Sequence, residues 1–269
     1  MPGLDARHLD GISETALLTL HQRATEAARP DRIIDDPMAV ALRDNVDYDY
    51  RRFGRTHQAT ALRALVFDAA TRHYLHTHPR ATVVALAEGL QTSFWRLDNG
   101  ALSWISVDLA PIVRLREQLL PPSDRLRCCA RSALDYSWMD EVDDSRGVLI
   151  TAEGLFQYLQ RGAVFDLITS CANRFRCGQL VFDSVPWLLS AYSRRRGFKL
   201  SEDYTAPPMS FSFTANQYDE LAAIPGIRTV RELHYPPGRG RLLRWVAPLS
   251  YRLPQLDRLR APVTLVEFG

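Results

Sequence analysis

The sequence is poor in cysteine and lacks the usual spacings of metal ligands. Its four cysteines are Cys128, Cys129, Cys171 and Cys177. Neighbouring residues of a strand point to opposite faces, so Cys128 and Cys129 cannot face one metal ion together. Cys171 and Cys177 are too far apart for a Cys-x-x-Cys pair, and no His-x-x-x-His, His-Glu-x-x-His or acidic calcium loop occurs. We therefore expect buried, reduced thiols and no metal site.

An excess of one charge and long apolar runs are also missing. Lys and Arg number 33 against 31 Asp and Glu, which leaves a net charge of +2 and no broad field for nucleic acid or a membrane surface. The only compact basic run, residues 194–196, is interpreted as a solvated loop face. No apolar run approaches the roughly 20 residues of a membrane span, and the N-terminal residues contain no apolar signal segment. These absences predict a cytoplasmic protein without nucleic-acid or membrane partners.

One stretch organises the rest of the chain. The apolar, β-branched run Thr82–Leu86 predicts a buried strand that leads into a loop of small residues around Gly89. A second strand, residues 102–107, ends in Asp108, 19 positions after Gly89. This is about the spacing (roughly 20 residues) at which a βαβ nucleotide-binding unit places a carboxylate on ribose hydroxyls. A βαβ unit with an acid at that position by chance is the alternative.

The glycine content of this loop narrows the choice of ligand. Dinucleotide sites use three glycines so that a pyrophosphate can approach the helix N-terminus. Here the corresponding positions hold Ala87, Gly89 and Thr92. A ligand with a ribose but without a pyrophosphate fits better, and S-adenosylmethionine is the obvious candidate.

Strands and helices alternate beyond this unit. Further strands are expected at residues 126–130, 148–152 and 179–183, with helices at 110–120 and 163–174. This alternation predicts a mostly parallel α/β sheet with helices on both faces. Ligands of such sheets lie at the carboxyl ends of the strands. Those ends carry Gly89, Asp108, Ser132-Ala133, Glu153-Gly154 and Asp183.

The flanking segments differ from this core. Helical periodicity at residues 16–28, 33–41 and 60–76 predicts an N-terminal helical cap (residues 1–78), with either a loop or a mobile helix end at 44–55. Residues 186–213 lose the pattern and are expected to form a lid, before a helix at 214–223 and strands at 226–233 and 263–268. Residues 242–246 are a further candidate strand. Aromatic side chains of the lid either line an acceptor pocket or pack a small core of their own: Trp187, Tyr192, Phe198, Tyr204 and Phe211.

Several segments together resemble one family. The stretches ALAEGLQTSFWRL, SVDLAPIVRLREQLLP and ITAEGLFQYL, preceded by ETALLTLHQRATEAARPDRIIDDPMA and ALRALVFDAA, are similar to leucine carboxyl methyltransferases and the related bacterial enzymes named after the tetracenomycin polyketide methyltransferase. The resemblance covers roughly residues 13–185. It implies a class I, Rossmann-like methyltransferase domain at residues 79–269, with a C-terminal lid insertion, that uses S-adenosylmethionine and no metal.

The resemblance also implies roles for individual residues. Arg63 would pair with the cofactor carboxylate, and Asp108 would accept hydrogen bonds from the ribose hydroxyls. Glu153 and Gly154 would lie near the methionine amino group or the transferring methyl, and Tyr158 would face the acceptor. The remaining positions expected at the cofactor are Ala87, Glu88, Gly89, Leu109, Ser132, Ala133 and Leu134. Two of these depart from the family pattern, because Ala87 stands where glycine is common and Ser132 where aspartate is usual.

The expected reaction is methyl transfer to an oxygen atom of a small molecule. A carboxylate acceptor needs no base, whereas a hydroxyl or phenol needs one, for which Glu153, Tyr158 and His8 are the candidates in that order. Carboxyl methylation of a peptide or protein C-terminus is one alternative. Cofactor binding without methyl transfer is another, suggested by Ala87 and Ser132. The protein is expected to be a monomer or a homodimer.

Overall fold

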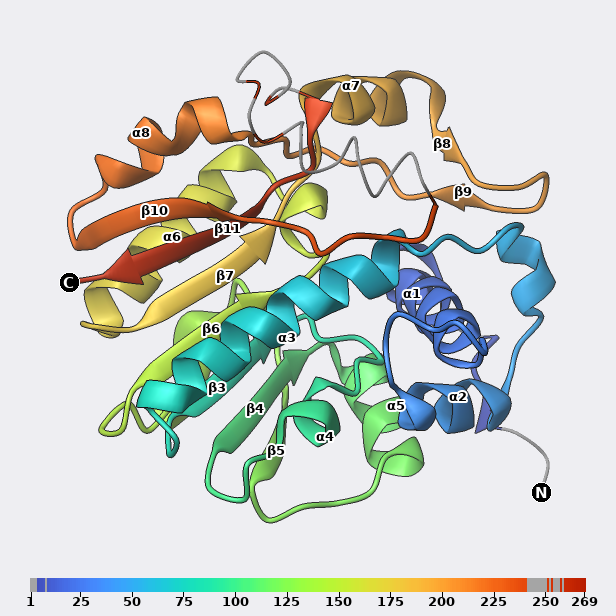
Figure 1. The fold of residues 1–269 in the computed structure, drawn as a ribbon, viewed down its shortest axis with the longest axis horizontal. Coiled ribbons are helices and arrows are strands. Elements are labelled where there is room, and N and C mark those ends of the chain that lie inside the picture. The colour runs from blue at the N-terminus through green and yellow to red at the C-terminus, as the bar shows by residue number, and fades with distance from the viewer. Residues whose placement is uncertain (1–3, 8, 241–250, 252, 254–256, 258) are drawn as a thin grey trace.

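A seven-stranded sheet forms the centre of the molecule (Figure 1). The computed structural model describes residues 4–7, 9–240, 251, 253, 257 and 259–269. The strand order is β10-β11-β7-β6-β3-β4-β5, and the last five strands of that order are parallel. These parallel strands are β3 (Thr82–Leu86), β4 (Ser103–Asp108), β5 (Leu126–Ala130), β6 (Val148–Ala152) and β7 (Gln179–Asp183). At the other edge, β11 (Val263–Phe268) runs antiparallel to β7, and β10 (Ile227–Leu233) antiparallel to β11.

The chain changes direction across the sheet between β3 and β6. It proceeds from β3 to β4 and β5 on one side, and then returns to build β6 and β7 on the other side. Ligands of open α/β sheets bind at such a switch point, beyond the carboxyl ends of the strands. The observed topology confirms the predicted α/β fold with a mostly parallel sheet.

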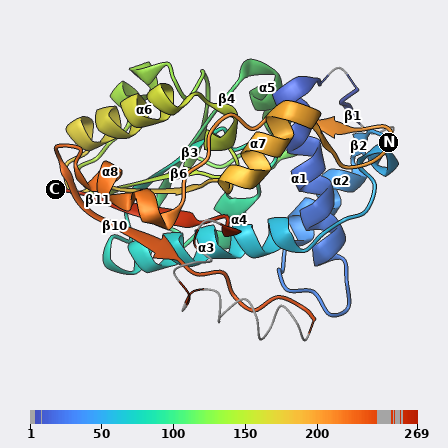
Figure 2. The same ribbon diagram turned by 90° about the horizontal axis from the view of Figure 1, so that it is seen from above.

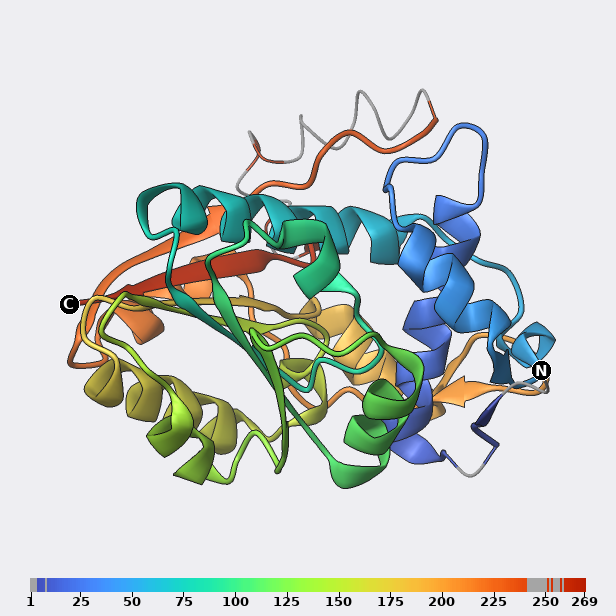
Figure 3. The same cartoon turned by 90° about the horizontal axis from the view of Figure 1, so that it is seen from below.

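Both faces of the sheet are buried, as expected for parallel strands. Successive residues of a strand, such as Val83 and Val84, point to opposite faces of the sheet and pack in different cores. One core includes α6 (Arg161–Arg174) and η2 (Tyr136–Glu141), and the other includes α3 (Ala59–Thr77) and α4 (Ser93–Leu97). Figure 3 shows α3 and α6 on opposite sides of the sheet. Although α3 precedes residue 79, it packs directly on the strands.

The N-terminal elements form a separate cluster at one end of the sheet (Figure 2). They comprise β1 (Leu4–Asp5), α1 (Gly11–Ala27), α2 (Pro37–Asp44), β2 (Val46–Asp47) and η1 (Tyr50–Phe53). Leu17 and Leu20 of α1 share their core with Ile112 and Leu115 of α5 (Ala110–Leu119). This group of elements is called the cap below. Residues 44–55, predicted as a loop or a mobile helix end, contain β2 and η1.

The predicted lid is more regular than its sequence suggests. It contains α7 (Trp187–Arg196) and a hairpin of β8 (Phe198–Lys199) and β9 (Thr205–Ala206), followed by η4 (Ala215–Gln217) and α8 (Tyr218–Ala222). The hairpin packs on the cap, where the rings of Tyr204 and Phe53 meet edge to face at 4.7 Å. Arginines 194–196 form the last turn of α7, so their prediction as a loop was wrong. The candidate strand at 242–246 lies outside the described residues.

Two features bear on the predictions made from absences. All four cysteines are free, but only Cys129 and Cys171 are buried, while Cys177 is exposed, contrary to expectation. Within the described part of the chain, none of the helices combines the length and the apolar character that crossing a bilayer requires.

Candidate functional site

A cavity of about 490 Å³ opens at the carboxyl ends of β3, β4 and β6. His8 lies outside the described residues, and all other residues that were given an individual role at the cofactor or in catalysis line this cavity. They are Arg63, Ala87, Glu88, Gly89, Asp108, Leu109, Ser132, Ala133, Leu134, Glu153, Gly154 and Tyr158. The structure therefore brings the predicted residues together, while their individual roles stay predictions.

The loop after β3 is tied to the end of β4. The Gly89 N–H donates to Asp108 Oδ2 at 2.7 Å, and the Leu109 N–H donates to Asp108 Oδ1 at 2.7 Å. Burial raises the pKa of Asp108, and the two backbone donors oppose this effect only partly. Each carboxylate oxygen keeps a further lone pair that can accept a hydrogen bond from a ligand in the cavity.

Ala87 adopts a backbone conformation that favours glycine. Its φ angle is 48°, and its N–H donates to the carbonyl oxygen of Val107 at 2.7 Å. An L-residue in this region carries a cost of about 1–2 kcal/mol. Alanine in place of glycine at this position therefore strains the backbone in the wall of the cavity.

A buried charge cluster lies at the ends of β6 and β7. Arg63 of α3 donates from Nε to Glu153 Oε1 and from Nη1 to Asp183 Oδ2, both at 3.0 Å. The Gly154 N–H donates to Asp183 Oδ1 at 2.5 Å. One guanidinium thus faces two carboxylates, which leaves the cluster with a surplus of negative charge. Sequence analysis placed Asp183 at a strand end but gave it no role, because its contact with Arg63 arises from the packing of α3.

Burial shapes the protonation of this cluster. It raises the pKa of Glu153, while Arg63 lowers it again. Burial also lowers the pKa of Arg63, but Asp183 and Glu153 outweigh that effect and raise it above its ordinary value. Arg63 is consequently a permanent cation, and Glu153 takes up a proton more readily than a carboxyl group in water.

Tyr158 of η3 (Phe156–Tyr158) also lines the cavity. Burial raises the pKa of its phenol, and hydrogen bonding with Gln157 and Thr15 lowers it only in part. A phenol with a raised pKa stays protonated near neutral pH and acts as a hydrogen-bond donor. Glu153 is therefore a better candidate base than Tyr158.

Most of the rest of the cavity lining comes from α1 of the cap, from the start of α3 and the residues before it, and from the hairpin and the segment that follows it. Its residues include Ile12, Thr15, Leu18, Gln22, His57, Thr60, Phe198, Leu200 and Met209. Sequence analysis did not single out His57, which lies two residues before the helix that carries Arg63. Among the residues that the structure describes, no group of three or more His, Cys, Asp or Glu side chains could hold a metal ion.

Only one of the five lid aromatics lines the cavity. Phe198 does so, whereas Tyr204 is buried against the cap and Phe211 packs with Phe156 and Phe213. The side chains of Trp187 and Tyr192 are exposed on α7. Of the two alternatives given for these rings, lining a pocket therefore holds for Phe198, and packing in an apolar core holds for Tyr204 and Phe211. Trp187 and Tyr192 follow neither alternative.

The strand order, the loop after β3 and the acid that ends β4 define a class I, S-adenosylmethionine-dependent methyltransferase fold. Solved structures agree with this fold. A protein described as a methyltransferase from Thermobifida fusca superposes with a TM-score of 0.55 at 12% identity, covering 94% of both chains. A DUF574 family protein from Streptomyces avermitilis gives 0.58 at 11% identity, covering 95% of this chain and 97% of the other.

Sequence comparison identifies the family. The leucine carboxyl methyltransferase family model matches residues 16–172. The tetracenomycin polyketide synthesis O-methyltransferase TcmP of Streptomyces glaucescens is 30% identical over 226 residues, 82% of each chain. The S-adenosyl-L-methionine-dependent methyltransferase dpfgK of Gibberella zeae is 30% identical over 200 residues, 65% of this chain and 67% of the other. The chain belongs to the leucine carboxyl methyltransferase family and is an S-adenosylmethionine-dependent methyltransferase, as its motifs predicted.

Proposed function

We propose that the protein transfers a methyl group from S-adenosylmethionine to a carboxylate or hydroxyl oxygen of a small molecule, as an enzyme of secondary metabolism. The observation that carries the proposal is one cavity that joins the Arg63–Glu153–Asp183 cluster to Asp108 and the loop at Gly89. The name of the relative TcmP supports O-methylation and a polyketide-like acceptor. We further propose a cytoplasmic monomer or homodimer.

The residues present fit this cofactor. The cavity volume falls within the range of small-molecule sites, about 300–1,000 Å³. The surplus of carboxylate at Glu153 and Asp183 suits a ligand with a sulfonium and an ammonium group. The Nη2 atom of Arg63 lies 3.2 Å from the position that a Cβ atom would take at Gly154, so glycine leaves the guanidinium open on that side.

The other contacts follow from position along the strand ends. Asp108 would accept hydrogen bonds from the ribose hydroxyls, with Ala87, Glu88, Gly89 and Leu109 around it. Ser132, Ala133 and Leu134 would hold the adenine. Bound there, the cofactor supplies an electrophilic methyl group on sulfur, so the protein needs to orient an acceptor oxygen and exclude water.

Residues of the cap and of the strand ends would together orient the acceptor oxygen and exclude water. The apolar side chains of α1 and the hairpin keep water from the acceptor, and Tyr158 donates a hydrogen bond to it. A carboxylate acceptor is already ionised. For a hydroxyl acceptor, Glu153 takes the proton, because its raised pKa makes it the better base of the two catalytic candidates.

A small-molecule acceptor is favoured over a peptide C-terminus. Both Arg63 and Arg131, the arginines that line the cavity in the described part of the chain, are already paired with carboxylates. Any carboxylate ligand, of a peptide or of a small molecule, would have to share a guanidinium with these side chains, so the preference for a small molecule rests on the name of the relative TcmP. Binding without methyl transfer is the second candidate function, and the strained backbone at Ala87 is the observation that favours it.

Calorimetric titration with S-adenosylmethionine and S-adenosylhomocysteine tests the proposal. We expect micromolar binding by the wild-type protein and no measurable binding by Asp108→Ala. Asp166→Ala, on the exposed side of α6, is the matched control and should bind normally. Undiminished binding by Asp108→Ala would sink the assignment of this cavity.

Mass spectrometry then separates the acceptor classes. The protein would be incubated with S-adenosylmethionine and with phenols, small carboxylic acids or peptides with free C-termini. The proposal expects a methyl ester or ether on a small molecule. Methylated peptides would support the C-terminal alternative, and cofactor binding without any methylated product would support the non-transferring one.

A further inference from the structure

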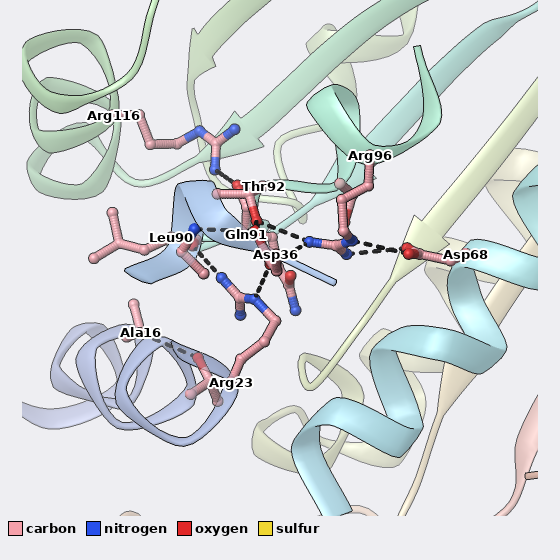
Figure 4. Close-up of polar contacts among 12 residues, drawn as sticks. Ala16, Arg23, Asp36, Asp68, Leu90, Gln91, Thr92, Arg96 and Arg116 are labelled. Atoms are coloured by element: carbon pink, nitrogen blue, oxygen red, sulfur yellow. Dashed lines mark hydrogen bonds and ion pairs between the residues drawn. The ribbon is translucent and has the colours of Figure 1, made fainter. Parts of the chain in front are cut away.

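Two buried guanidiniums hold the carbonyl groups of the loop after β3 (Figure 4). Arg23 donates from Nη2 to the carbonyl oxygen of Leu90 at 2.7 Å. Arg116 of α5 donates from Nη1 to the carbonyl oxygens of Gly89 at 2.8 Å and Gln91 at 2.9 Å. Three successive carbonyls are therefore held by side chains from outside the loop. The conformation of residues 89–91 depends on where those side chains are placed.

Arg23 belongs to the cap and is fixed there by Asp36. Its Nε atom lies 2.9 Å from Asp36 Oδ2, and both side chains are fully buried. Asp36 also accepts hydrogen bonds from the Thr92 hydroxyl at 2.6 and 2.8 Å and forms an ion pair with Arg96 at 2.7 Å. Arg96 in turn pairs with Asp68 of α3. The network consequently links α1, the loop, α4 and α3 through charged groups that water does not reach.

The same helix that carries Arg23 forms part of the cavity wall. Thr15, Leu18 and Gln22 of α1 line the cavity. The Cβ atom of Ala16 lies 3.3 Å from the position that a Cβ atom would take at Gly89. Helix α1 thus touches the cofactor loop directly at Gly89, reaches it through Arg23 at Leu90, and faces the acceptor with its neighbouring residues.

We propose that Arg23 is a positioning residue that couples the cap to the cofactor loop, so that cofactor binding and the seating of α1 over the acceptor cavity occur together. The proposal rests on the proposed use of S-adenosylmethionine at this site. A buried ion pair adds little net stability compared with apolar packing. Asp36 also has Arg96 and Thr92 as partners, so the bond to Leu90 is the contact for which Arg23 is specifically needed.

A matched pair of substitutions separates this role from a merely structural one. Arg23→Lys keeps the positive charge beside Asp36, but an ammonium cannot reach Asp36 and the Leu90 carbonyl with the fixed geometry of a guanidinium. Arg96→Lys damages the same buried network but removes no bond to a loop carbonyl. Both variants should lower the melting temperature by similar amounts.

Affinity for S-adenosylmethionine should distinguish them. We expect Arg23→Lys to raise the Kd about tenfold, as for the loss of a charge-assisted hydrogen bond, and Arg96→Lys to raise it less than threefold. Hydrogen exchange gives the second measurement. In the wild type, S-adenosylmethionine should slow exchange in residues 88–92 and in α1 together, whereas in Arg23→Lys the protection of α1 should be lost.

The charge of Arg23 supplies a third readout. Burial and the neighbouring carboxylate of Asp183 raise the pKa of Glu153, while the cations Arg63 and Arg23 lower it. Arg96 and Tyr235 also interact electrostatically with Glu153. Arg23→Met removes a positive charge, so the loss of cofactor affinity on acidification should begin at a higher pH than in the wild type. Arg23→Lys should keep the wild-type profile.

The outcomes separate the coupling from the function on which it depends. If the wild type binds S-adenosylmethionine and Arg23→Lys binds it within twofold, or if Arg96→Lys loses as much affinity as Arg23→Lys, the coupling is overturned and the function stands. If the folded wild type does not bind S-adenosylmethionine at all, the proposed function fails, and the coupling fails with it.

Discussion

At the scale of single residues, buried carboxyl groups and a strained backbone conformation lie in the wall of the cavity, where a ligand would contact them. Asp108 and Glu153 are buried carboxyl groups with raised pKa values, and Ala87 keeps a left-handed backbone between them. Strained or electrostatically disfavoured groups persist where the surrounding structure enforces them, and they concentrate at functional sites.

Replacing Ala87 with glycine should not destabilise the protein. Glycine removes a strain of about 1–2 kcal/mol but increases the freedom of the unfolded chain by about 0.4–1 kcal/mol. The expected result is a free energy of unfolding between unchanged and about 1.6 kcal/mol higher, measured by urea denaturation. Ala41→Gly, on the exposed side of α2, is the control and should cost about 1 kcal/mol. A comparable loss of unfolding free energy in Ala87→Gly would show that the backbone at Ala87 is not strained.

The affinity for S-adenosylmethionine should fall as the pH decreases. Because the pKa values of Glu153 and Asp108 are raised, these groups become protonated at a higher pH than free carboxyl groups do. The ionised forms attract the cationic cofactor and accept from its hydroxyls, so affinity is complete above the raised pKa values and is lost as the pH falls through them. Calorimetry between about pH 7 and pH 5 would measure this. Glu153→Gln should bind more weakly with a flatter profile, and a rise in wild-type affinity on acidification would refute the assignment.

How far single residues could be predicted depends on what brings them together. Gly89, Asp108 and Glu153 could be found because parallel strands end at one edge, so position along the chain predicts position in space. Asp183 and Arg23 could not be assigned in this way. Their partners are reached by the packing of α3 and of the cap, for which the sequence carries no spacing rule.

At the scale of elements, the hairpin β8–β9 shows where periodicity fails. Each of its strands has two residues, too few for an alternating pattern, and α7 exposes apolar and basic side chains alike. By contrast, β3, β6 and β7 are five-residue strands with apolar central residues, and the prediction of a strand was confirmed for each of them. The predicted burial of β3 was confirmed at all five positions. The strands of the central sheet therefore have a recognisable apolar pattern, whereas the hairpin that packs on the cap has a weaker one.

The hairpin's contribution to stability can be measured through its aromatic residues. Tyr204 is 3% exposed and packs against Phe53, whereas Tyr192 on α7 is 50% exposed. Tyr204→Ala should lower the free energy of unfolding by about 3–5 kcal/mol, because it opens a cavity in the core of the cap. Tyr192→Ala should change it by no more than about 0.5 kcal/mol. Equal effects in chemical denaturation would mean that the hairpin does not pack on the cap as described.

At the scale of the whole molecule, the cavity lies between two bodies of different construction. The sheet has a core on each face, and the cap has its own core, which reaches the sheet domain through α5. The family match at residues 16–172 spans both bodies. The matched range includes most of the cap and the strands β3 to β6, so it crosses the boundary near residue 78 that residue patterns predict.

A ligand that contacts both bodies should stabilise the molecule as a whole. At a concentration of about 100 times its Kd, a ligand that binds only the folded state adds about 2.7 kcal/mol. For a chain of this size, that amounts to a rise in melting temperature of about 5 °C or more. We expect this rise in the wild type with S-adenosylmethionine, together with slower proteolysis of the cap, because α1 touches the cofactor loop at Gly89. Asp108→Ala should show neither effect at the same concentration. If the melting temperature rose while the cap remained equally sensitive to protease, the ligand would be stabilising the sheet domain alone, and the cap would have no part in the cofactor site.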